Sequence, residues 1–512
     1  MKIVSGEEMS KVDKVTIEEV GIPGPVLMEE AGKGTALHIT KKITRDDRIL
    51  VITGKGNNGG DGYVIHRWLR HWGYDCTTIL LAGHDEIGGD ARLNLDILYK
   101  LNERIIEIDN RNRLDEIKEH IKDSDLIVDA ILGTGLKGDV RGISSDVIEL
   151  INQGEGMVCA VDIPSGLDSV KGVPLGLAVE ADFTVTFALP KIGLLLYPGQ
   201  DYVGNLEVID IGIPRQVIDG ADFKHNWVTR DNCREMLPLR PKTGHKGTFG
   251  RVLVIAGSEG MSGAAALTST AALRSGAGLV TLAVPESLNP ILEVKLTEVM
   301  TRPLPEKDGQ LSTEGIIPIH QLLEGQDIVV VGPGLGQSSG LESIMETIIN
   351  ETEAPLVIDA DGLNNIRNLL SLLKKRDELT VLTPHPGELA RLLDIEISEL
   401  LEDRLNYTRE MAEEYGVVLV SKGAPTITAF PNGHVYINST GNEGMGTGGT
   451  GDVLTGVIGG MLAQQTDLFS VVAAVYTHGL AGDLKAEKDH SRSLLAGDLL
   501  DGLALAFNRI ET

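Results

Sequence analysis

The sequence is poor in cysteine and in aromatic residues. Three cysteines, Cys76, Cys159 and Cys233, occur among 512 residues, and their spacing fits neither a disulfide framework nor a metal site. This use of cysteine favours a reducing compartment. Aromatic residues make up 4% of the chain, whereas glycine occurs 61 times. That balance suits tight loops above parallel sheets better than an aromatic-rich β-sandwich.

Positive charge is also scarce. Lys and Arg number 46 against 74 Asp and Glu, which gives a formal net charge of −28. A field of this sign repels the phosphate backbone of nucleic acids, so we expect no nucleic-acid partner. A small anionic ligand would need local help from glycine loops and a few lysines.

Long apolar runs are absent as well. No uncharged run reaches the length of a membrane span, and residues 1–8 lack the apolar region of a signal peptide. We therefore expect a cytoplasmic protein with no membrane partner. The chain is too long for one hydrophobic core, so two large domains are expected.

The stretch 446–462 stands out because six Gly and Thr residues run into Asp452, and an apolar helical pattern follows. Unpaired N–H groups at a helix start, approached closely through glycine, can hold a phosphate. An acid beside that anion suits a base that deprotonates a hydroxyl attacking phosphorus. The alternative is an ordinary glycine-rich turn with Asp452 as a helix cap.

The first half alternates between short apolar runs and amphipathic segments. This alternation predicts a mostly parallel sheet with helices on both faces. Strands are expected at 48–53, 77–82, 105–108, 126–131, 157–161 and 183–187, and helices at 7–19, 26–43, 63–72, 90–102, 113–121 and 144–153.

Three glycine-containing loops with acids or hydroxyls follow predicted strands, at 54–62, 129–139 and 162–168. Ligands of parallel sheets bind beyond the carboxyl ends of the strands, so these loops predict a binding site. For the first loop, the alternative is an Asn-Gly turn with Asp61 as a helix N-cap.

The second half repeats the strand-and-loop pattern. Strands are expected at 252–256, 328–331, 355–359, 380–382, 417–421 and 435–437, with Gly, Pro and a polar group after nearly every one. The alternation is lost between Pro214 and Trp227, so we place domains at 1–225 and 226–512. The predicted class is α/β, with two three-layer αβα domains.

The first half resembles the NAD(P)H-hydrate epimerase family, which has a Rossmann-like fold. The likeness rests on Asn-Asn-Gly-Gly-Asp-Gly from Asn57, Gly-Thr-Gly-Leu from Gly133 and Asp-Ile-Pro-Ser-Gly-Leu from Asp162. It implies that Asp162 lies on the substrate as acid/base, and that Asn58, Asp129 and Ser165 hold a potassium ion. The other substrate-binding residues that it implies are Asn57, Asn58, Gly59, Gly60, Asp61, Gly133, Thr134, Gly135, Leu136, Lys137, Gly138 and Asp139.

The second half resembles the ADP- or ATP-dependent NAD(P)H-hydrate dehydratases of the ribokinase-like superfamily. Gly-Thr-Gly-Asp at 449–452 and Thr-Pro-His-Pro-Gly-Glu at 383–388 carry this likeness. It implies that Asp452 is catalytic and that Ala264, Gly336, His385 and Asp452 contact the hydrate. The nucleotide contacts that it implies are Lys422, Gly423, Ala424, Pro425, Thr426, Asn442, Gly449, Thr450 and Gly451.

Together the halves resemble the bifunctional NAD(P)H-hydrate repair family. The resemblance implies epimerisation of R and S hydrates of NADH and NADPH. It also implies dehydration of the S form with ADP or ATP, releasing AMP or ADP and phosphate. Mg²⁺ is expected with the nucleotide, and the chain is expected to be a homo-oligomer.

Blander interpretations accompany these assignments. His385, between two prolines, can be placed by the turn alone, Lys422 can be a solvated surface lysine, and Glu388 fits a cap of the following helix better than a chemical role. Two other functions stay open. One is a ribokinase-like small-molecule kinase with a regulatory nucleotide-binding first half. The other is a scaffold, because the first-half fold also occurs as a non-catalytic module in RNA-decapping proteins; the acids Asp129 and Asp162 favour an enzyme.

Overall fold

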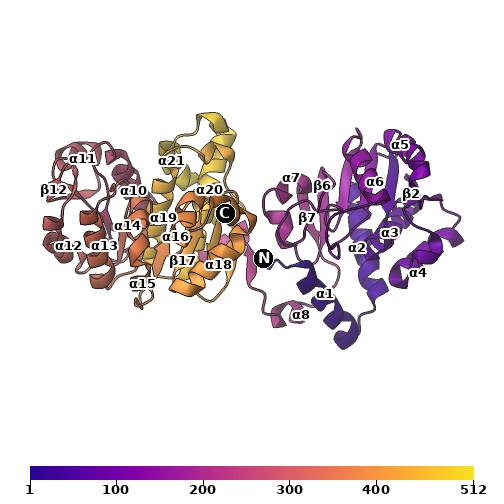
Figure 1. Ribbon diagram of the computed structural model, residues 1–512, viewed down its shortest axis with the longest axis horizontal. Coiled ribbons are helices and arrows are strands. Elements are labelled where there is room, and N and C mark those ends of the chain that lie inside the picture. The colour runs from indigo at the N-terminus through magenta and orange to yellow at the C-terminus, as the bar shows by residue number, and fades with distance from the viewer. The chain divides into compact units, whose positions relative to one another are not determined.

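The computed structural model describes all 512 residues, and the chain divides into two compact units (Figure 1). One unit spans Lys2–His225, and the other spans Asn226–Thr512 together with Met1. None of the helices combines the length and the apolar character needed to cross a membrane.

The N-terminal unit is built on a seven-stranded sheet in the order β3-β2-β1-β4-β5-β6-β7, in which all neighbours run parallel. The order reverses at β1, so β1 and β4 lie side by side at the point where ligands bind in doubly wound sheets. The strands are β1 (Arg48–Thr53), β2 (Asp75–Leu80), β3 (Ile105–Glu107), β4 (Leu126–Ala130), β5 (Met157–Val161), β6 (Phe183–Phe187) and β7 (Asn205–Ile209).

Both faces of this sheet are covered, which explains why its central strands are apolar throughout. In β1, Ile49 and Val51 pack with α1, α2 and α3, whereas Leu50 and Ile52 pack with α5 and α6 on the other face. The helices are α1 (Gly6–Lys14), η1 (Val15–Val20), α2 (Gly24–Ile39), α3 (Asn57–His71), η2 (His84–Glu86), α4 (Gly89–Lys100), η3 (Arg111–Arg113), α5 (Leu114–Lys122), α6 (Ile143–Asn152), η4 (Ile192–Leu195), α7 (Gly199–Val203) and α8 (Arg215–Gly220).

The C-terminal unit contains a ten-stranded sheet in the order β11-β10-β9-β14-β15-β16-β17-β18-β19-β8. Strands from β11 to β17 pair in parallel, and β17, β18 and β19 pair antiparallel. The strands are β8 (His225–Trp227), β9 (Arg251–Ile255), β10 (Leu279–Pro285), β11 (Met300–Leu304), β14 (Ile328–Val331), β15 (Leu356–Ile358), β16 (Thr380–Leu382), β17 (Val418–Ser421), β18 (Ile427–Ala429) and β19 (Val435–Ile437), with a separate hairpin of β12 (Glu306–Lys307) and β13 (Gln310–Leu311).

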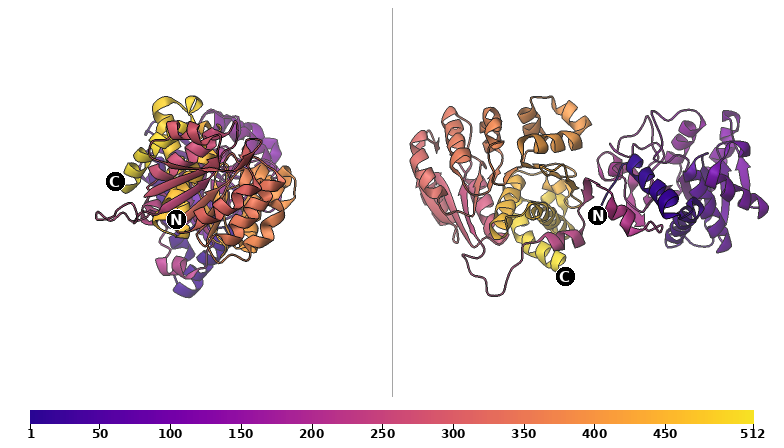
Figure 2. Two further views of the ribbon diagram at one scale, coloured as in Figure 1. Left: turned by 90° about the vertical axis from the view of Figure 1, so that its left-hand side faces the viewer. Right: turned by 90° about the horizontal axis from the view of Figure 1, so that it is seen from below.

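Helices lie on both faces of this sheet, as Figure 2 shows from two directions. Its core is formed largely by α10, α19, α20 and α21 against the central strands. The helices are α9 (Arg230–Met236), α10 (Ser262–Arg274), α11 (Asn289–Lys295), η5 (Thr313–Gly315), α12 (Ile316–Leu323), α13 (Ser339–Glu351), α14 (Asp361–Asn365), η6 (Arg367–Leu369), α15 (Leu370–Leu373), α16 (Pro386–Leu393), α17 (Ile397–Glu402), α18 (Arg404–Tyr415), η7 (Glu443–Met445), α19 (Thr450–Gln464), α20 (Leu468–Asp489), η8 (Ser491–Ser493) and α21 (Ala496–Glu511).

The predicted α/β class with largely parallel sheets is confirmed, but one local prediction is wrong. The glycine run that follows β1 was expected to be a loop up to Gly62, with Asp61 as a possible N-cap. Helix α3 instead begins at Asn57, and its N-cap is Gly56. Glycine permits this early start because a Cβ on Gly59 would lie 2.3 Å from the carbonyl oxygen of Gly54, a contact that only glycine avoids.

Candidate active sites

Helix α3 places Asn58 at the carboxyl end of β1, against the loop after β4. The Asn58 side-chain amide donates to the carbonyl of Leu132 over 3.0 Å, and the residue is 8% exposed. Its Oδ1 oxygen is buried and has no hydrogen-bond partner. A buried amide oxygen without a donor is rare, and it marks a position for a ligand that accepts an oxygen lone pair.

Asp129, on β4, lies beside the same loop and is fully buried. Its carboxyl accepts from the Ser165 hydroxyl over 2.6 Å and from the Ser165 backbone over 2.8 Å. Leu132 donates its backbone N–H to the same hydroxyl. Burial raises the pKa of Asp129 to about 6, although its bonds to Ser165 oppose that shift. Thus Asn58, Asp129 and Ser165 converge around Leu132.

Asp162 follows β5 with a left-handed backbone, at φ 66°. Its Oδ1 accepts from the ammonium of Lys191, from the Thr186 hydroxyl over 3.1 Å and from the Phe187 N–H over 3.2 Å. Lys191 is 1% exposed, so this ion pair is shielded from water on the lysine side. The positive φ is a strained conformation for a non-glycine residue, and such strain concentrates at functional sites.

Two further acids surround this ion pair. Asp61, in the second turn of α3, is buried, and burial together with Asp162 and Asp13 raises its pKa well above the usual range. Asp13, on α1, has its pKa raised to about 6, chiefly by burial.

The loop at 133–139 is half-buried at its beginning and mostly exposed towards its end. A Cβ on Gly133 would lie 3.4 Å from the Cβ of Asn58, and a Cβ on Gly6 would lie 2.8 Å from that of Thr134. Leu136 packs on the apolar core beside the sheet. The remaining predicted positions, Gly135, Lys137, Gly138 and Asp139, are exposed, as is Asn57.

In the C-terminal unit, Asp452 lies in the first turn of α19, as the sequence predicts. The helix begins at Thr450 after Gly449, whose φ is 94°, and its first turn contains Gly451 and Asp452. The backbone carbonyl of Asp452 accepts from the Thr268 hydroxyl of α10 over 3.1 Å. The N–H groups at this helix start are therefore available to an anion beside the carboxyl of Asp452.

The ammonium of Lys422 lies at the same helix start. It would be 3.3 Å from a Cβ on Gly451, and it donates to Asp359 Oδ1 over 2.7 Å. The other oxygen of Asp359 accepts from the Thr455 hydroxyl of α19 over 2.5 Å. Lys422 is thus not a solvated surface lysine: its side chain is 18% exposed and joins the ends of β15, β17 and α19.

The carboxyl of Asp452 is set apart from the other acids by its pKa. Burial raises this pKa to about 7, with Asp359, Asp361 and Glu388 adding to the shift and Lys422 opposing it. The pKa of Lys422 is lowered by burial but raised more by Asp359 and Glu388, so the net shift is upward. The site therefore holds a permanent cation next to an acid that titrates near neutrality.

Residues 385–388 form the start of α16. The His385 Nδ1 atom accepts from the N–H groups of Gly387 and Glu388 over 3.0 and 3.2 Å, and the Glu388 carboxyl accepts from the His385 N–H over 2.8 Å. The expectation that Glu388 caps this helix is confirmed. His385 caps it as well, and burial lowers the pKa of its imidazole.

The other predicted contact residues lie around the start of α19. Ala264 lies on α10, next to Gly334, and Gly336 donates its N–H to Asp361 Oδ2 over 2.9 Å. Arg404 donates to the carbonyls of Lys422 and Pro425 and so orders the segment 422–426, in which Gly423 and Ala424 are exposed. Asn442 bonds to Asp483 over 2.9 Å, and Thr450 donates to Met445 over 2.9 Å.

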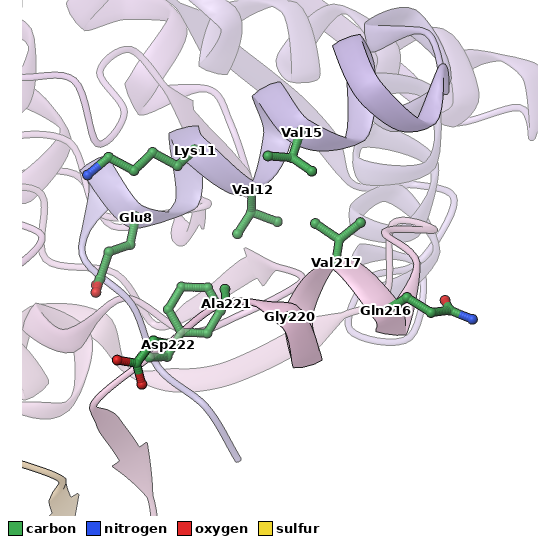
Figure 3. A pocket seen from close by; sticks show the side chains of 10 residues that line it. Glu8, Lys11, Val12, Val15, Gln216, Val217, Gly220, Ala221 and Asp222 are labelled. Atoms are coloured by element: carbon green, nitrogen blue, oxygen red, sulfur yellow. The ribbon is translucent and has the colours of Figure 1, made fainter. Parts of the chain in front are cut away.

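A separate apolar pocket of about 520 Å³ lies between α1 and α8 in the N-terminal unit (Figure 3). Val12 and Val15 face Val217 across it, and Glu8 and Asp222 also line it. None of the predicted site residues lines this pocket.

The two halves match two different family models. Residues 24–193 match the YjeF-related protein N-terminus, and residues 252–504 match NAD(P)H-hydrate dehydratase. Over 521 aligned residues, the chain is 42% identical to the bifunctional NAD(P)H-hydrate repair enzyme Nnr of Moorella thermoacetica, covering 100% of this chain and 97% of that protein.

The chain belongs to the bifunctional NAD(P)H-hydrate repair enzyme family. The Escherichia coli member is 34% identical and covers 98% of this chain, with 93% of its own length matched. A crystal structure of the Bacillus subtilis ADP/ATP-dependent NAD(P)H-hydrate dehydratase, co-crystallised with ATP and Mg²⁺, aligns at a TM-score of 0.50 with 33% identity. It covers 56% of this chain and 99% of the Bacillus subtilis chain.

Four charged residues of the two sites were not predicted from the sequence. Lys191 and Asp13 flank Asp162, and Asp359 and Asp361 act on Lys422 and Asp452. Asp359 and Asp361 had a signal, since they follow a predicted strand in the same way as the chosen loops. Lys191 and Asp13 had none, because only folding brings them to Asp162.

Proposed function

We propose that this chain repairs hydrated NADH and NADPH with two activities: epimerisation of the R and S hydrates, and dehydration of the S hydrate driven by ADP or ATP. The observation that carries the proposal is Asp452, whose carboxyl lies beside the amides of α19 and the ammonium of Lys422. Membership of the bifunctional repair family supports it. Epimerisation is assigned to residues 1–225 and dehydration to residues 226–512.

Dehydration must overcome a poor leaving group. Hydroxide leaves C6 of the hydrated nicotinamide ring reluctantly, but phosphate leaves readily once the hydroxyl is phosphorylated. In the proposed reaction Asp452 accepts the hydroxyl proton as the oxygen attacks the terminal phosphorus of the nucleotide. The electrons of the ring nitrogen then expel phosphate from C6, which leaves a C6–N1 iminium, and loss of a proton from C5 forms the C5–C6 double bond of NADH or NADPH.

The start of α19 would stabilise charge during this transfer. Backbone N–H groups of Gly449, Thr450 and Gly451 donate where negative charge develops, and the Lys422 ammonium adds a full positive charge at the same place. The ammonium of Lys422 donates to Asp359, and this hydrogen bond fixes its position. Ala264, Gly336 and His385 are proposed to hold the hydrate.

The segment 422–426 and the loop from Asn442 to Gly451 are proposed to bind the nucleotide. Arg404 orders the first through two backbone carbonyls, and the Thr450 hydroxyl closes the second onto Met445. The Bacillus subtilis relative was co-crystallised with ATP and Mg²⁺, which supports a nucleotide with Mg²⁺ here. Bound Mg²⁺ would neutralise phosphate charge and would be held largely by phosphate and water.

In the N-terminal unit, Asp162 is the proposed acid/base, and the helix start 57–61 with the loop 133–139 is the proposed substrate site. Potassium fits the oxygen cluster formed by Asn58, Asp129 and Ser165. The buried Oδ1 of Asn58 lacks a donor, and carbonyl, hydroxyl and carboxylate oxygens are the ligands that such a hard cation prefers. A bound potassium ion would supply positive charge at this edge of the sheet.

A direct test combines the protein with hydrated NADH and either ADP or ATP. The proposal predicts recovery of the NADH absorbance band together with release of orthophosphate. A ribokinase-like kinase would instead leave a stable phosphorylated product, and a scaffold would change neither signal. Either of those results would reject the proposal. The same assay, run with each nucleotide, identifies the preferred phosphate donor.

The surroundings of the reaction are also proposals. The charge of −28 supports the absence of a nucleic-acid partner. The three buried, unpaired cysteines support a cytoplasmic, reducing compartment. A homo-oligomer is expected, which sedimentation of the purified protein would test.

A further inference from the structure

The proposed epimerase site contains more carboxyls than its cations can balance. Asp162, after β5, contacts the ammonium of Lys191, which follows β6, and Asp13 on α1 and Asp61 on α3 interact electrostatically with this ion pair. Lys191 is 1% exposed and Asp61 is 8% exposed. Three ionised carboxylates beside one buried ammonium would repel one another in a medium of low polarity, so the cluster retains at least one proton at neutral pH.

Asp162 makes the contacts that a carboxylate accepts. Asp162 receives the ammonium of Lys191, the hydroxyl of Thr186 and the N–H of Phe187, all on Oδ1. Donors of this kind stabilise a carboxylate. The lysine is fixed in turn, because its ammonium also donates to Thr186 Oγ1 over 3.1 Å.

Asp61 has the opposite environment. Its side chain is buried, and hydrogen bonds are not among the causes that shift its pKa. Burial raises its pKa well above the usual range, Asp162 and Asp13 raise it further, and Lys191 opposes the shift. Helices α2 and α4, which also pack on α3, present the uncharged Met28 and Ala91 at the preceding residue, Gly60. Burial and the neighbouring carboxyls therefore favour the protonated form of Asp61.

We propose that Asp61 is the proton donor and Asp162 the proton acceptor of the epimerase, and that Lys191 is a positioning residue that keeps Asp162 ionised. The inference rests on the proposed epimerisation and assigns its two proton-transfer roles. It uses the pairing found in sites where two acids in different environments perform opposite functions.

The proposed step balances as follows. The Asp61 carboxylic acid gives its proton to the C6 hydroxyl as the C6–O bond breaks, and water leaves. The lone pair of the ring nitrogen forms the second bond of a C6–N1 iminium, and Asp61 becomes a carboxylate. Water then adds to the other face of C6 and loses a proton to the Asp162 carboxylate. Proton transfer from Asp162 to Asp61 restores the starting enzyme.

The test uses the full chain with Asp61→Asn, and Asp46→Asn as a matched exposed control in the same unit. Interconversion of separated R and S hydrates is followed by chromatography. We expect kcat for Asp61→Asn to fall by about 100-fold or more, the lower end of general acid catalysis, with KM nearly unchanged. Dehydration of the S hydrate by the same preparation should be normal, which reports an intact chain.

A pH profile separates a chemical role from a structural one. Wild-type epimerisation should decline at high pH as Asp61 loses its proton, and Asp61→Asn should lack that decline in its residual activity. Lys191→Met should move the high-pH decline to higher pH, because the ammonium of Lys191 opposes the raised pKa of Asp61. In labelled water, the wild type should place solvent oxygen on C6 at the rate of epimerisation.

Two failures are distinguishable. If the wild type does not interconvert the hydrates, the proposed epimerase function is wrong, and this inference is wrong with it. If the wild type is active but Asp61→Asn keeps more than half of the wild-type kcat, or its high-pH decline persists unchanged, only the assignment of Asp61 is overturned. Retention of the original oxygen on C6 in the wild type would also overturn it.

Discussion

Two acids near Lys422, Asp359 and Asp452, have different roles. Asp359 is 1% exposed and receives both the ammonium and the Thr455 hydroxyl, so its lone pairs are already engaged. Asp452 lacks these bonds and has its pKa raised to about 7, first by burial and then by Asp359. A base works best when its pKa lies near the operating pH. The arrangement therefore leaves Asp452 as the group that can exchange a proton at neutral pH.

Replacing Asp452 with Asn should remove dehydration while leaving the fold and the amide cradle in place. We expect kcat to fall by about 10²–10⁴-fold, because the hydroxyl loses its general base. ADP or ATP affinity, measured by calorimetry, should not fall, since the substitution removes an acidic charge that repels the phosphates. Asp377→Asn, an exposed acid in the same unit, is the control. Near-normal turnover by Asp452→Asn would contradict the role.

The rate of dehydration should rise with pH through about 7, the pKa of Asp452, because the ionised form is the base.

Stability should respond in the opposite sense. The pKa of this carboxyl is higher in the folded state than its ordinary 3.8, so its contribution is full below about 4 and is lost as pH rises to about 7. The melting temperature of Asp452→Asn relative to wild type should therefore increase between pH 5 and pH 7.5 and then level off. A constant difference across this range would contradict the raised pKa.

Helix α19 depends on small residues along the face that meets α10. A Cβ on Gly456 would lie 2.2 Å from the carbonyl oxygen of Thr268, and one on Gly460 would lie 2.1 Å from the Ser275 hydroxyl. This close approach places the start of α19, with Asp452 and Gly451, against the middle of α10, where the Thr268 hydroxyl donates to the carbonyl of Asp452. Glycine is thus required here for packing, although it is unfavourable in a helix interior.

Gly456→Ala should destabilise the C-terminal unit by about 1–3 kcal/mol, the usual result of overpacking a core. At an uncrowded helical position the same change stabilises by about 0.8–1 kcal/mol, so the predicted sign is reversed. Gly497→Ala in the first turn of α21, where a Cβ meets nothing within 4 Å, is the matched control. Urea unfolding of the two variants measures the difference, and equal stability would reject close helix packing as the reason for this glycine.

At the level of elements, the sequence predicted most of the central strands and the helix that begins beside Asp452. These elements could be predicted because strands buried on both faces are apolar throughout, and because α19 starts with a glycine-rich turn. Strands β7, β8, β10, β11, β12, β13 and β18 were not predicted. Strand β10 (Leu279–Pro285) shows why one of these strands was missed. It includes a threonine and ends in proline, so the apolar run in its sequence is short and the end of the strand is hard to recognise.

The candidate sites were predictable only where a residue adjoins a glycine loop at a strand end. Asp129, Asp162, Lys422 and Asp452 meet that condition. Asp13 lies within an amphipathic helix, and Lys191 follows β6 with no glycine between them, so neither carries a local signature. Their meeting with Asp162 depends on long-range packing, including the bridge between Val4 and Lys191.

Across the whole molecule, each unit has its own sheet and its own apolar core. Each of the two proposed sites is built from side chains of one unit only. Each proposed activity thus has its structural requirements inside one unit. The two activities are linked through chemistry, because the epimerase supplies the S hydrate that the dehydratase consumes.

Expression of the halves separately should therefore separate the activities. Residues 226–512 with nucleotide should convert only the S share of a mixed hydrate to NADH and then stop, apart from the slow spontaneous epimerisation measured in a protein-free blank. Adding residues 1–225 should carry the reaction to completion without nucleotide being consumed by that half. Absorbance of the NADH band and chromatography of the two hydrates would follow both phases. If the C-terminal half alone consumed both hydrates at the rate of the full chain, epimerisation would not require the cluster at Asp162, and the assignment of one activity to each unit would be wrong.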